Sequence, residues 1–472
     1  MKTNYYITTT LPYVNAEPHI GFGMEIVAAD VLARYHRLLE EKVVFNTGTD
    51  EHGLKIYQKA VEENKEPQAY VDKYAAKFDE LKTLLNLSYT NFIRTTDESH
   101  IKAAQEFWKR CDKNGDIYKK NYKINYCVGC ELEKTDSELV ENKCPLHPDR
   151  ELEIIEEENY FFRFSKYEEA LKNLFKENPE FVRPEGKYKE ITSFVEEGLN
   201  DFSISRLRSK LPWGIPVPGD EAQVMYVWFD ALINYISTLG WPNEESDFAN
   251  FWPGVQIAGK DNLRQQSAMW QAMLMSSGIS TSKQILINGF ITIDGKKMSK
   301  SLSNVITPKE LVDKFSVDGA RFLLLDMGPV HEDIDVTWEK LNNRYQSFLA
   351  NGLGNTVSRV AALCQKSEFE FGESEKILDS KVTENLEKYR FDMALGEIWA
   401  ELKSLDQSIE ETQPWKQEGD ELETSLKSYV SKIRNIAFNL RPFLPETAEK
   451  ILIQFKGSKI VKEESLFPRL EA

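Results

Sequence analysis

Three cysteines and one histidine near residue 130 have the spacing of metal ligands. Cys127 and Cys130 form a C-x2-C pair, and Cys144 and His147 form a C-x2-H pair after the intervening residues 131–143. Each pair can turn two soft ligands toward one ion, and three thiolates with one imidazole match tetrahedral zinc. Because four protein ligands leave no open coordination position, we expect a structural zinc ion. Free cysteines beside a turn are the alternative at this spacing.

A histidine and a glycine lie where an expected strand gives way to an expected helix. His19 and Gly21 belong to the sequence PHIGF, which follows the β-branched and aromatic residues 5–10 and precedes apolar residues that recur at helical spacing from Met24. Backbone amides at a helix N-terminus attract phosphate, and a histidine there can donate to phosphate oxygens. Taken alone, such a triplet is more often part of a turn.

Two lysines in a later loop could hold a triphosphate. Lys297 and Lys300 belong to KMSKS, which follows the turn-forming pair Asp294 and Gly295. Their charges would matter most as negative charge moves onto a departing pyrophosphate. For an isolated lysine-rich segment, a solvated basic loop is the usual interpretation. The pairing of this loop with PHIGF is what favours a nucleotide site.

The composition indicates a globular protein of a reducing compartment. The chain has 472 residues, of which 41% are hydrophobic and 29% charged, so it can form several domains. Five cysteines, three of them clustered, do not resemble a disulfide framework, and the N-terminal sequence lacks the charged and apolar regions of a secretory signal. We therefore expect a cytoplasmic protein. The net charge of -17 argues against non-specific nucleic-acid binding but is compatible with local basic patches.

The order of the expected elements indicates an α/β protein with a helical C-terminal part. Strand, glycine-containing loop, helix and strand over residues 5–46 open a parallel sheet, whose ligands are expected at the carboxyl ends of its strands. From residue 338 onward the apolar spacing is helical. We expect five segments: 1–111 and 221–293 as halves of the sheet domain, 112–220 as a metal-binding insertion, 294–337 around KMSKS, and 338–472 as a helical bundle.

Taken together, these motifs resemble a known enzyme family. The ordered set LPYVNAEPHIG, TGTDEHG, the cysteine insertion, YVWFDALINY and KMSKSLSNVI is similar to the methionyl-tRNA synthetases, which are class I aminoacyl-tRNA synthetases. The resemblance covers essentially the whole chain. It implies a Rossmann-like parallel-sheet catalytic domain split by an insertion with one zinc knuckle, followed by an α-helical anticodon-binding domain.

The resemblance also implies roles for residues that their own pattern does not single out. By periodicity Trp228 and Tyr235 are core residues, and Asp50 could be a turn or capping carboxylate. The matching family positions bind methionine, whose thioether contacts aromatic rings favourably and whose ammonium group pairs with a carboxylate. The methionine-binding residues implied in this way are Leu11, Tyr13, Asp50, Trp228, Ala231, Tyr235 and Gln266. The residues implied for ATP are His19, Gly21, Glu25, Asp261 and Lys300, with Lys297 assisting His19 and Lys300 in catalysis.

Three C-terminal residues match positions that recognise the anticodon in the family. Asn355 and Arg359 are four residues apart, so a helix presents both on one face, and Trp415 lies in QPWKQ. An amide and a guanidinium can read base edges, and an exposed indole can stack on an unpaired base. A surface polar pair and a helix-capping tryptophan are the alternatives.

The sequence departs from the family pattern at three positions. Phe22 stands where the first signature usually has a second histidine, and it cannot donate to ATP. Gln266 replaces a histidine that many relatives carry, so this position can form hydrogen bonds but cannot titrate near neutrality. Leu232 stands where some relatives have proline. These changes affect details of the pocket and leave the expected reaction class unchanged.

The reaction implied by the resemblance is the ATP-dependent attachment of methionine to tRNA(Met). Methionine and ATP with Mg²⁺ would form methionyl-adenylate, and the 3' adenosine of tRNA would then take the methionyl group. Another class I synthetase, for leucine, isoleucine, valine or cysteine, is the nearest alternative, and a non-catalytic tRNA-binding relative is another. Residues 112–220 leave little room for the large editing domain of the aliphatic enzymes. We expect a monomer with no obligatory protein partner and no membrane association.

Overall fold

The computed structural model describes residues 3–130, 132–134, 139–243, 245–298, 304–373 and 376–470. These residues form two compact units. The first contains residues 1–17, 42–80 and 89–287, and the second contains residues 18–41, 81–88 and 288–472. The five predicted segment boundaries stay predictions.

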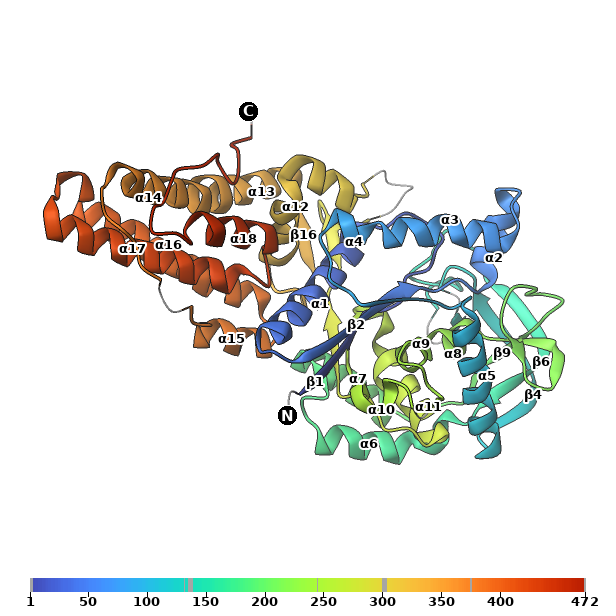
Figure 1. The fold of residues 1–472 in the computed structure, drawn as a ribbon. Helices are drawn as coiled ribbons and strands as arrows, with labels where there is room; N and C mark the ends of the chain where they lie inside the picture. Colours follow the sequence, from blue (N-terminus) through green and yellow to red (C-terminus); the bar gives the residue numbers. More distant parts are fainter. Residues whose placement is uncertain are drawn as a thin grey trace. The chain divides into compact units, whose positions relative to one another are not determined.

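The centre of the first unit is a six-stranded sheet of order β3-β2-β1-β12-β13-β7. The pairs β3–β2, β2–β1, β1–β12 and β13–β7 are parallel, which confirms the predicted parallel α/β architecture (Figure 1). The expected strands at residues 5–10 and 43–46 appear as β1 and β2. The strands of this sheet are β1 (Asn4–Thr8), β2 (Lys42–Thr49), β3 (Asn91–Arg94), β7 (Val182–Arg183), β12 (Val255–Gly259) and β13 (Gln284–Asn288).

Helices of the first unit bury aromatic side chains in a common core. Phe107 of α5 stacks on Trp270 of α11 with ring centroids 5.6 Å apart, and Trp108 of α5 meets Phe229 edge-on at 5.2 Å. Such rings bury large apolar areas and so fix the helices in place. The helices of this unit are α2 (Leu54–Glu62), α3 (Pro67–Asp79), α5 (Glu98–Lys113), α6 (Glu168–Glu177), α7 (Glu185–Glu196), α8 (Val227–Ala231), α9 (Asn234–Ser237), α10 (Phe248–Phe251) and α11 (Trp270–Ser277).

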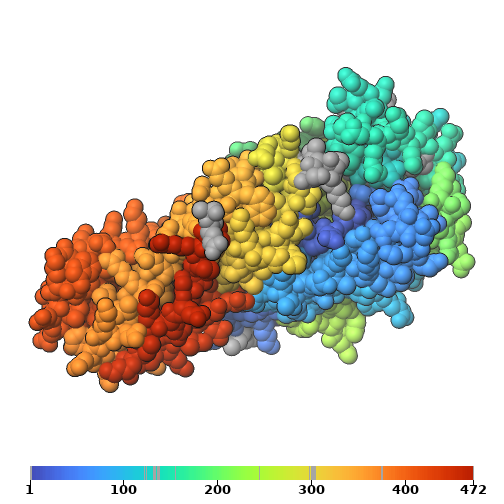
Figure 2. All heavy atoms as spheres, turned by 90° about the horizontal axis from the view of Figure 1, so that it is seen from above, coloured from blue at the N-terminus to red at the C-terminus, as the bar shows by residue number. Residues whose placement is uncertain are grey.

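The insertion is built on a long antiparallel hairpin. Its sheet has the order β5-β4-β6-β8, and β4 pairs with β6 from Ile117 opposite Phe162 to Tyr126 opposite Glu153. In Figure 2 the turquoise residues of the insertion form a raised part of the surface. Its strands are β4 (Ile117–Cys127), β5 (Leu132–Lys134), β6 (Glu153–Phe162) and β8 (Phe202–Ser203). A second small sheet has the order β10-β11-β9, formed by β9 (Ser205–Leu207), β10 (Pro216–Val217) and β11 (Asp220–Met225).

The second unit joins helix α1 (Ile20–Leu38) to the C-terminal half of the chain. Its small sheet has the order β15-β14-β16, formed by β14 (Ile291–Ile293), β15 (Lys296–Lys297) and β16 (Ile334–Val336). Thr307 caps the following helix α12 (Pro308–Asp326) in a reciprocal pair of hydrogen bonds with Glu310. The short helix α4 (Leu81–Leu84) also belongs to this unit.

The predicted C-terminal bundle is present in the second unit. Figure 1 shows α14, α16 and α17 side by side, and their apolar faces meet through buried leucine, isoleucine and valine residues. The helices are α13 (Trp338–Arg344), a π-helical stretch Tyr345–Gly354, α14 (Asn355–Lys366), α15 (Ser380–Glu387), α16 (Phe391–Thr412), α17 (Gly419–Leu440) and α18 (Pro445–Gln454). Across the described part of the chain, none of the helices combines the length and apolarity that crossing a membrane requires.

Candidate functional site

The four predicted metal ligands converge at the end of β4. The ligand atoms of Cys127, Cys130, Cys144 and His147 all lie within 4.8 Å of one another. Cys130 Sγ is 3.3 Å from Cys144 Sγ and 3.2 Å from His147 Nδ1. Three sulfurs and one imidazole nitrogen clustered in this way could hold one metal ion.

Gly129 allows the loop between the first two cysteines to approach the histidine. A side-chain carbon at Gly129 would lie 2.5 Å from His147 Cγ, closer than nonbonded carbon atoms approach. The second half-site is a turn in which His147 N donates to Cys144 O at 3.0 Å. Tyr126 and Val128, which flank Cys127, pack against Leu54. The loop is therefore attached to the start of α2 through an apolar contact.

Two residues of the implied methionine set meet where β2 ends. Tyr13 and Asp50 form a parallel backbone bridge, in which Asp50 N donates to Pro12 O at 3.0 Å and Val14 N donates to Asp50 O at 3.3 Å. Asp50 is buried, and Leu11 and Tyr13 are half-buried. A carboxylate at the carboxyl end of a parallel strand is where α/β proteins bind ligands.

A histidine–carboxylate pair that was not predicted links this strand end to α8. His52 Nδ1 lies 3.1 Å from Asp230 Oδ2, and both side chains are buried. Burial raises the pKa of Asp230, and the neighbouring His52 opposes that rise. Asp230 lies between Trp228 and Ala231 in sequence, so the pair joins two segments of the implied methionine set. The only sequence signal for it was the histidine in TGTDEHG.

The remaining methionine candidates lie on α8, α9 and the adjoining π-helical turn Gln265–Met269. Gln266 Nε2 donates to the Tyr235 hydroxyl, and the Tyr235 ring packs edge-on against Trp270 with centroids 6.0 Å apart. Trp228 is half-buried, and among the described residues no hydrogen-bond acceptor lies within reach of its Nε1. Ala231 is 7% exposed.

Asp261, a candidate for ATP, is exposed in a short turn after β12.

In the second unit, His19 is the N-cap residue of α1. Its Nδ1 accepts a hydrogen bond from Gly21 N at 3.0 Å, and the side chain is exposed. In a neutral ring whose Nδ1 accepts a hydrogen bond, the proton is on Nε2. A side-chain carbon at Gly21 would lie 2.8 Å from His19 Cε1, so this hydrogen bond requires glycine. Glu25 is buried one turn further along α1.

The two signature segments are neighbours within the second unit. Ile20 N donates to Ile306 O at 3.0 Å, and Met298 Cε lies 3.7 Å from the place that a side-chain carbon at Gly21 would take. Met298 within KMSKS and Ile306 after it therefore both lie near the start of α1. The backbone of Lys297 ends β15. The Lys297 side chain and the whole of Lys300 fall outside the described residues.

The structure brings the three anticodon candidates to one part of the bundle. Asn355 begins α14 and is exposed, and Arg359 follows one turn later. The Arg359 guanidinium lies over the Trp415 ring, 5.4 Å from its centroid, and is 2.7 Å from Glu410 Oε1. Trp415 is 52% exposed, which is unusual for so large a ring.

Comparisons with known proteins identify relatives of the whole chain. The family model "tRNA synthetases class I (M)" matches residues 5–153 and 137–361. Methionine–tRNA ligase of Caldanaerobacter subterraneus is 38% identical over all of this chain and 80% of its own length. The ligase of Rickettsia typhi is 37% identical over all of this chain and 96% of its own length.

Solved structures are similar over the whole chain. Mycobacterium tuberculosis methionyl-tRNA synthetase in complex with methionyl-adenylate is 34% identical, with a TM-score of 0.94 over 99% of this chain and 100% of that one. The free form of the same enzyme has a TM-score of 0.86 at 31% identity, over 100% of this chain and 99% of that one. By its family model, its relatives and its fold, the chain belongs to the class I tRNA synthetases of the methionine group.

Proposed function

We propose that this chain is a methionine–tRNA ligase. It activates methionine with ATP and transfers the methionyl group to the 3' adenosine of tRNA(Met). The observation that carries this proposal is the similarity, over the whole chain, to an enzyme solved with methionyl-adenylate. The binding partners are therefore methionine, ATP and tRNA.

The first step needs recognition of both ends of methionine. Asp50, buried at the end of β2, is suited to pair with the ammonium group, and the Leu11 backbone lies on the adjoining segment. Trp228 and Tyr235 are suited to contact the thioether, because sulfur interacts favourably with aromatic rings. The hydrogen bond from Gln266 orients the Tyr235 hydroxyl, so glutamine can serve at a position where other relatives carry histidine.

Activation joins the methionine carboxylate to the α-phosphorus of ATP and releases pyrophosphate. The Nε2 proton of His19 is suited to stabilise charge on the phosphate oxygens. Lys297 and Lys300 are suited to stabilise the negative charge that moves onto the departing pyrophosphate. Gly21, Glu25 and Asp261 are further candidates for ATP contacts, and Mg²⁺ accompanies ATP. Phe22 supplies no donor, so His19 carries the histidine role of this motif alone.

In the second step, a ribose hydroxyl of the terminal adenosine bonds to the methionyl carbonyl carbon. The bond to AMP breaks, AMP leaves with the electron pair, and the hydroxyl proton is released. No protein nucleophile is required, so the enzyme acts by positioning and electrostatics. Asn355, Arg359 and Trp415 are suited to read unpaired anticodon bases by hydrogen bonding and stacking.

Two further properties belong to this proposal. The metal at Cys127, Cys130, Cys144 and His147 is zinc, because three thiolates and one imidazole form a closed set typical of structural zinc. The enzyme works in the cytoplasm, where thiols stay reduced and where tRNA is charged.

Amino-acid-dependent ATP–pyrophosphate exchange tests the proposal. Each standard amino acid is offered in turn to the purified protein, and exchange is expected with methionine alone. Exchange with leucine, isoleucine, valine or cysteine would support a class I synthetase but contradict methionine as its substrate. If folded, metal-loaded protein shows no exchange with any amino acid, the ligase assignment is wrong.

A further inference from the structure

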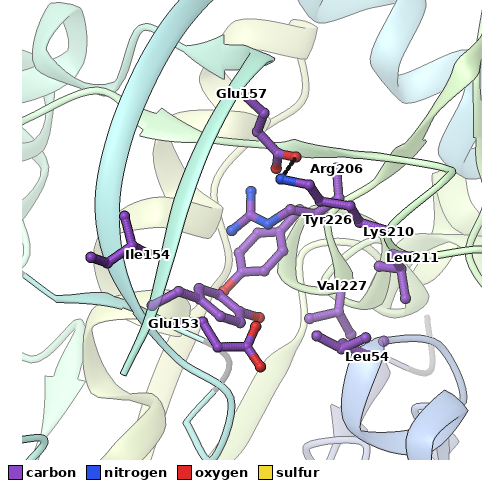
Figure 3. A pocket seen from close by; sticks show the side chains of 11 residues that line it. Leu54, Glu153, Ile154, Glu157, Arg206, Lys210, Leu211, Tyr226 and Val227 are labelled. Atoms are coloured by element: carbon purple, nitrogen blue, oxygen red, sulfur yellow. Dashed lines mark ion pairs between the residues drawn. The ribbon is translucent and has the colours of Figure 1, made fainter. Parts of the chain in front are cut away.

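A pocket of about 400 Å³ lies within the first unit, beside the insertion (Figure 3). Arg206, Tyr126 and Tyr226 form part of its wall, and all three are buried. The Arg206 guanidinium lies 4.5 Å from the Tyr226 ring centroid and 5.3 Å from that of Tyr126. Because these groups are stacked on one another, the pocket offers no open aromatic face to a ligand.

Tyr235 and Gln266, two candidates for the methionine site, lie next to α11 in the same unit. Gln266 Nε2 donates to the Tyr235 hydroxyl. The Tyr235 ring packs edge-on against Trp270, the first residue of α11, and Tyr235 O accepts from the Tyr6 hydroxyl at 2.8 Å. Whatever holds Gln266 therefore also decides where the Tyr235 hydroxyl lies.

The side chain of Gln271 holds the backbone of Gln266. Its Nε2 donates to Gln266 O at 2.7 Å and to Ser282 Oγ at 3.1 Å, and its Oε1 accepts from Ser282 N at 2.9 Å. A primary amide has two donor hydrogens and one acceptor oxygen, so both ends of the Gln271 side chain are engaged. Gln271 is fully buried, where a polar group is tolerated only when it is hydrogen-bonded. Its orientation is therefore fixed, and with it the Gln266 carbonyl.

The hydrogen bonds continue from Ser282 to the centre of the sheet. Ser282 Oγ donates to Gln256 Oε1 at 2.8 Å. Gln256 is fully buried on β12, which pairs with β1 in the middle of the six-stranded sheet. Gln256, Ser282 and Gln271 are called the Gln271 network below. Through Gln266, this network connects β12 to Tyr235.

The Gln271 network supports a part of the chain where the helix is irregular. Residues Gln265–Met269 form a π-helical turn, in which Trp270 N donates to Gln265 O, five residues back instead of four. Such turns are rare and occur frequently at functional sites. The Gln271 side chain bonds to a carbonyl of this turn. It therefore stabilises a backbone geometry from which the Gln266 side chain reaches Tyr235.

We propose that the Gln271 network positions the methionine site and sets its selectivity for a thioether. The inference rests on the proposed function and deepens it. Sulfur contacts aromatic rings favourably, and this contact depends on where the ring edge lies. Gln271, Ser282 and Gln256 act through Gln266 on the Tyr235 ring, so they are positioning residues.

Variants of Gln271 and Ser282 test the proposal in two assays. ATP–pyrophosphate exchange gives kcat and KM for methionine, norleucine and ATP, and calorimetry gives the binding of each amino acid without ATP. Norleucine is the matched probe, because a methylene group replaces the sulfur of methionine in it. Gln271→Met removes the hold on Gln266 O. Ser282→Ala removes only the hydroxyl that links Gln271 to Gln256, and Ser282→Thr keeps it.

Gln223→Met is the matched control. Gln223 is buried in the same unit, where it accepts from Ser205 Oγ at 2.8 Å and donates to Glu158 O at 2.7 Å. This variant therefore loses a buried, hydrogen-bonded glutamine outside the Gln271 network. Effects common to both glutamine variants report general stability, which thermal unfolding measures directly.

For Gln271→Met, the KM for methionine is expected to rise about tenfold while the KM for ATP changes less than about twofold. The ratio of kcat/KM for methionine to that for norleucine should fall about threefold or more, because the sulfur–aromatic contact is weakened while the apolar contact remains. Ser282→Ala should show the same pattern more weakly. Ser282→Thr and Gln223→Met should keep the ratio of the wild type.

Two results would show that the Gln271 network supports the fold alone and would overturn the inference. They are an unchanged methionine-to-norleucine ratio in Gln271→Met, and equal rises in KM for methionine and ATP. If Gln271→Met does not fold, Ser282→Ala decides by the same criteria. Both results leave the proposed function in place as long as the wild type exchanges with methionine. A wild type that binds methionine without exchange would overturn the proposed function, and the binding of methionine and norleucine to the variants would then decide the role of the network.

Discussion

His52 Nδ1 and Asp230 Oδ2 lie 3.1 Å apart, and this contact joins the end of β2 to α8. Asp50 and Trp228 each lie two residues from one member of the pair, so the pair sets the spacing between two implied methionine contacts. The His52 ring also packs against Trp213, with centroids 5.5 Å apart, and Trp213 Nε1 donates to Glu51 O at 2.6 Å. We therefore predict that His52 and Asp230 position the proposed methionine site.

Replacing Asp230 by asparagine should weaken methionine binding more than ATP binding. Asparagine keeps the shape but replaces a charge-assisted hydrogen bond, which is worth about 1.5–3 kcal/mol, with a weaker one. We expect the KM for methionine in the exchange reaction to rise about tenfold. The KM for ATP should change little, and His52→Asn should repeat the pattern. Equal rises in both KM values would indicate a general loss of structure.

Removing one metal ligand should release the metal and lower the melting temperature. Cys144→Ser removes a thiolate from a set whose four ligand atoms lie within 4.8 Å. For a domain of about 150–250 residues, each kcal/mol lost lowers Tm by about 2–4 °C. Metal content by mass spectrometry and thermal unfolding provide the measurement. Cys364→Ala, which changes a buried cysteine outside the set, should leave metal content intact. Full metal content in Cys144→Ser would exclude it as a ligand.

Burial of His100 should make folding less favourable as pH falls below about 6.5, which is the ordinary pKa of a histidine side chain. Burial, followed by the neighbouring His52, lowers the pKa of His100 to about 3. Between these values the unfolded chain binds a proton that the folded chain does not, so stability falls with pH by up to about 1.4 kcal/mol per unit. Above about pH 6.5, the ordinary pKa of histidine, His100 is neutral in both the folded and the unfolded chain, so this loss of stability is absent. Urea unfolding of wild type and His100→Asn between pH 4 and 7 should show a shallower pH dependence for the variant. Parallel curves would contradict the prediction.

The buried ion pair of the second unit should be costly to break. Arg321 Nη2 lies 2.8 Å from Asp30 Oδ2 with both side chains fully buried, and Arg321 also donates to Phe443 O at 2.8 Å and Leu85 O at 3.0 Å. Burial raises the pKa of Asp30, but Arg321, Arg34 and Ser88 together outweigh it and hold the pKa below its usual value.

Arg321→Met leaves that carboxylate buried with a weaker set of partners, which should cost about 3–5 kcal/mol. Denaturant unfolding measures the loss. The exposed ion pair between Lys309 and Asp313 provides the control, because Lys309→Met should cost less than about 1 kcal/mol. Similar losses for the two variants would show that burial does not decide the cost.

Trp415→Ala should impair tRNA charging through tRNA affinity. The indole is 52% exposed and lies under Arg359, so it offers a flat face to an unpaired base. Stacking of a base on such a ring is worth about 1–3 kcal/mol. The KM for tRNA in aminoacylation should therefore rise about tenfold, and the methionine-dependent exchange rate should fall far less. Trp338→Ala, at a tryptophan of α13 that is 37% exposed, should affect tRNA binding little.

The sequence indicated the family through short contiguous motifs. PHIGF, TGTDEHG and KMSKS each occupy a few residues, and their chemistry depends on local geometry such as the His19 cap on Gly21 N. Helical and strand periodicity in turn predicted β1, β2 and the C-terminal bundle, because burial on one face repeats along a single element. The roles of individual site residues stay predictions that the experiments above address.

Other relationships required the folded chain. His52 and Asp230 are 178 residues apart in the sequence, and Arg321 and Phe443 are 122 apart, so no local sequence pattern predicts either contact. The pocket beside the insertion is assembled from residues between Gly53 and Val227 that share no motif.

Metal-ligand spacing, capping and periodicity were therefore determined by the sequence itself, because they are set by neighbouring residues along one backbone segment. The pairing of Tyr235 with Gln266 and the stacking of Arg206 on two tyrosines were decided only by the tertiary structure. These contacts arise from the packing of separate strands and helices, whose relative positions depend on burial summed over the whole core.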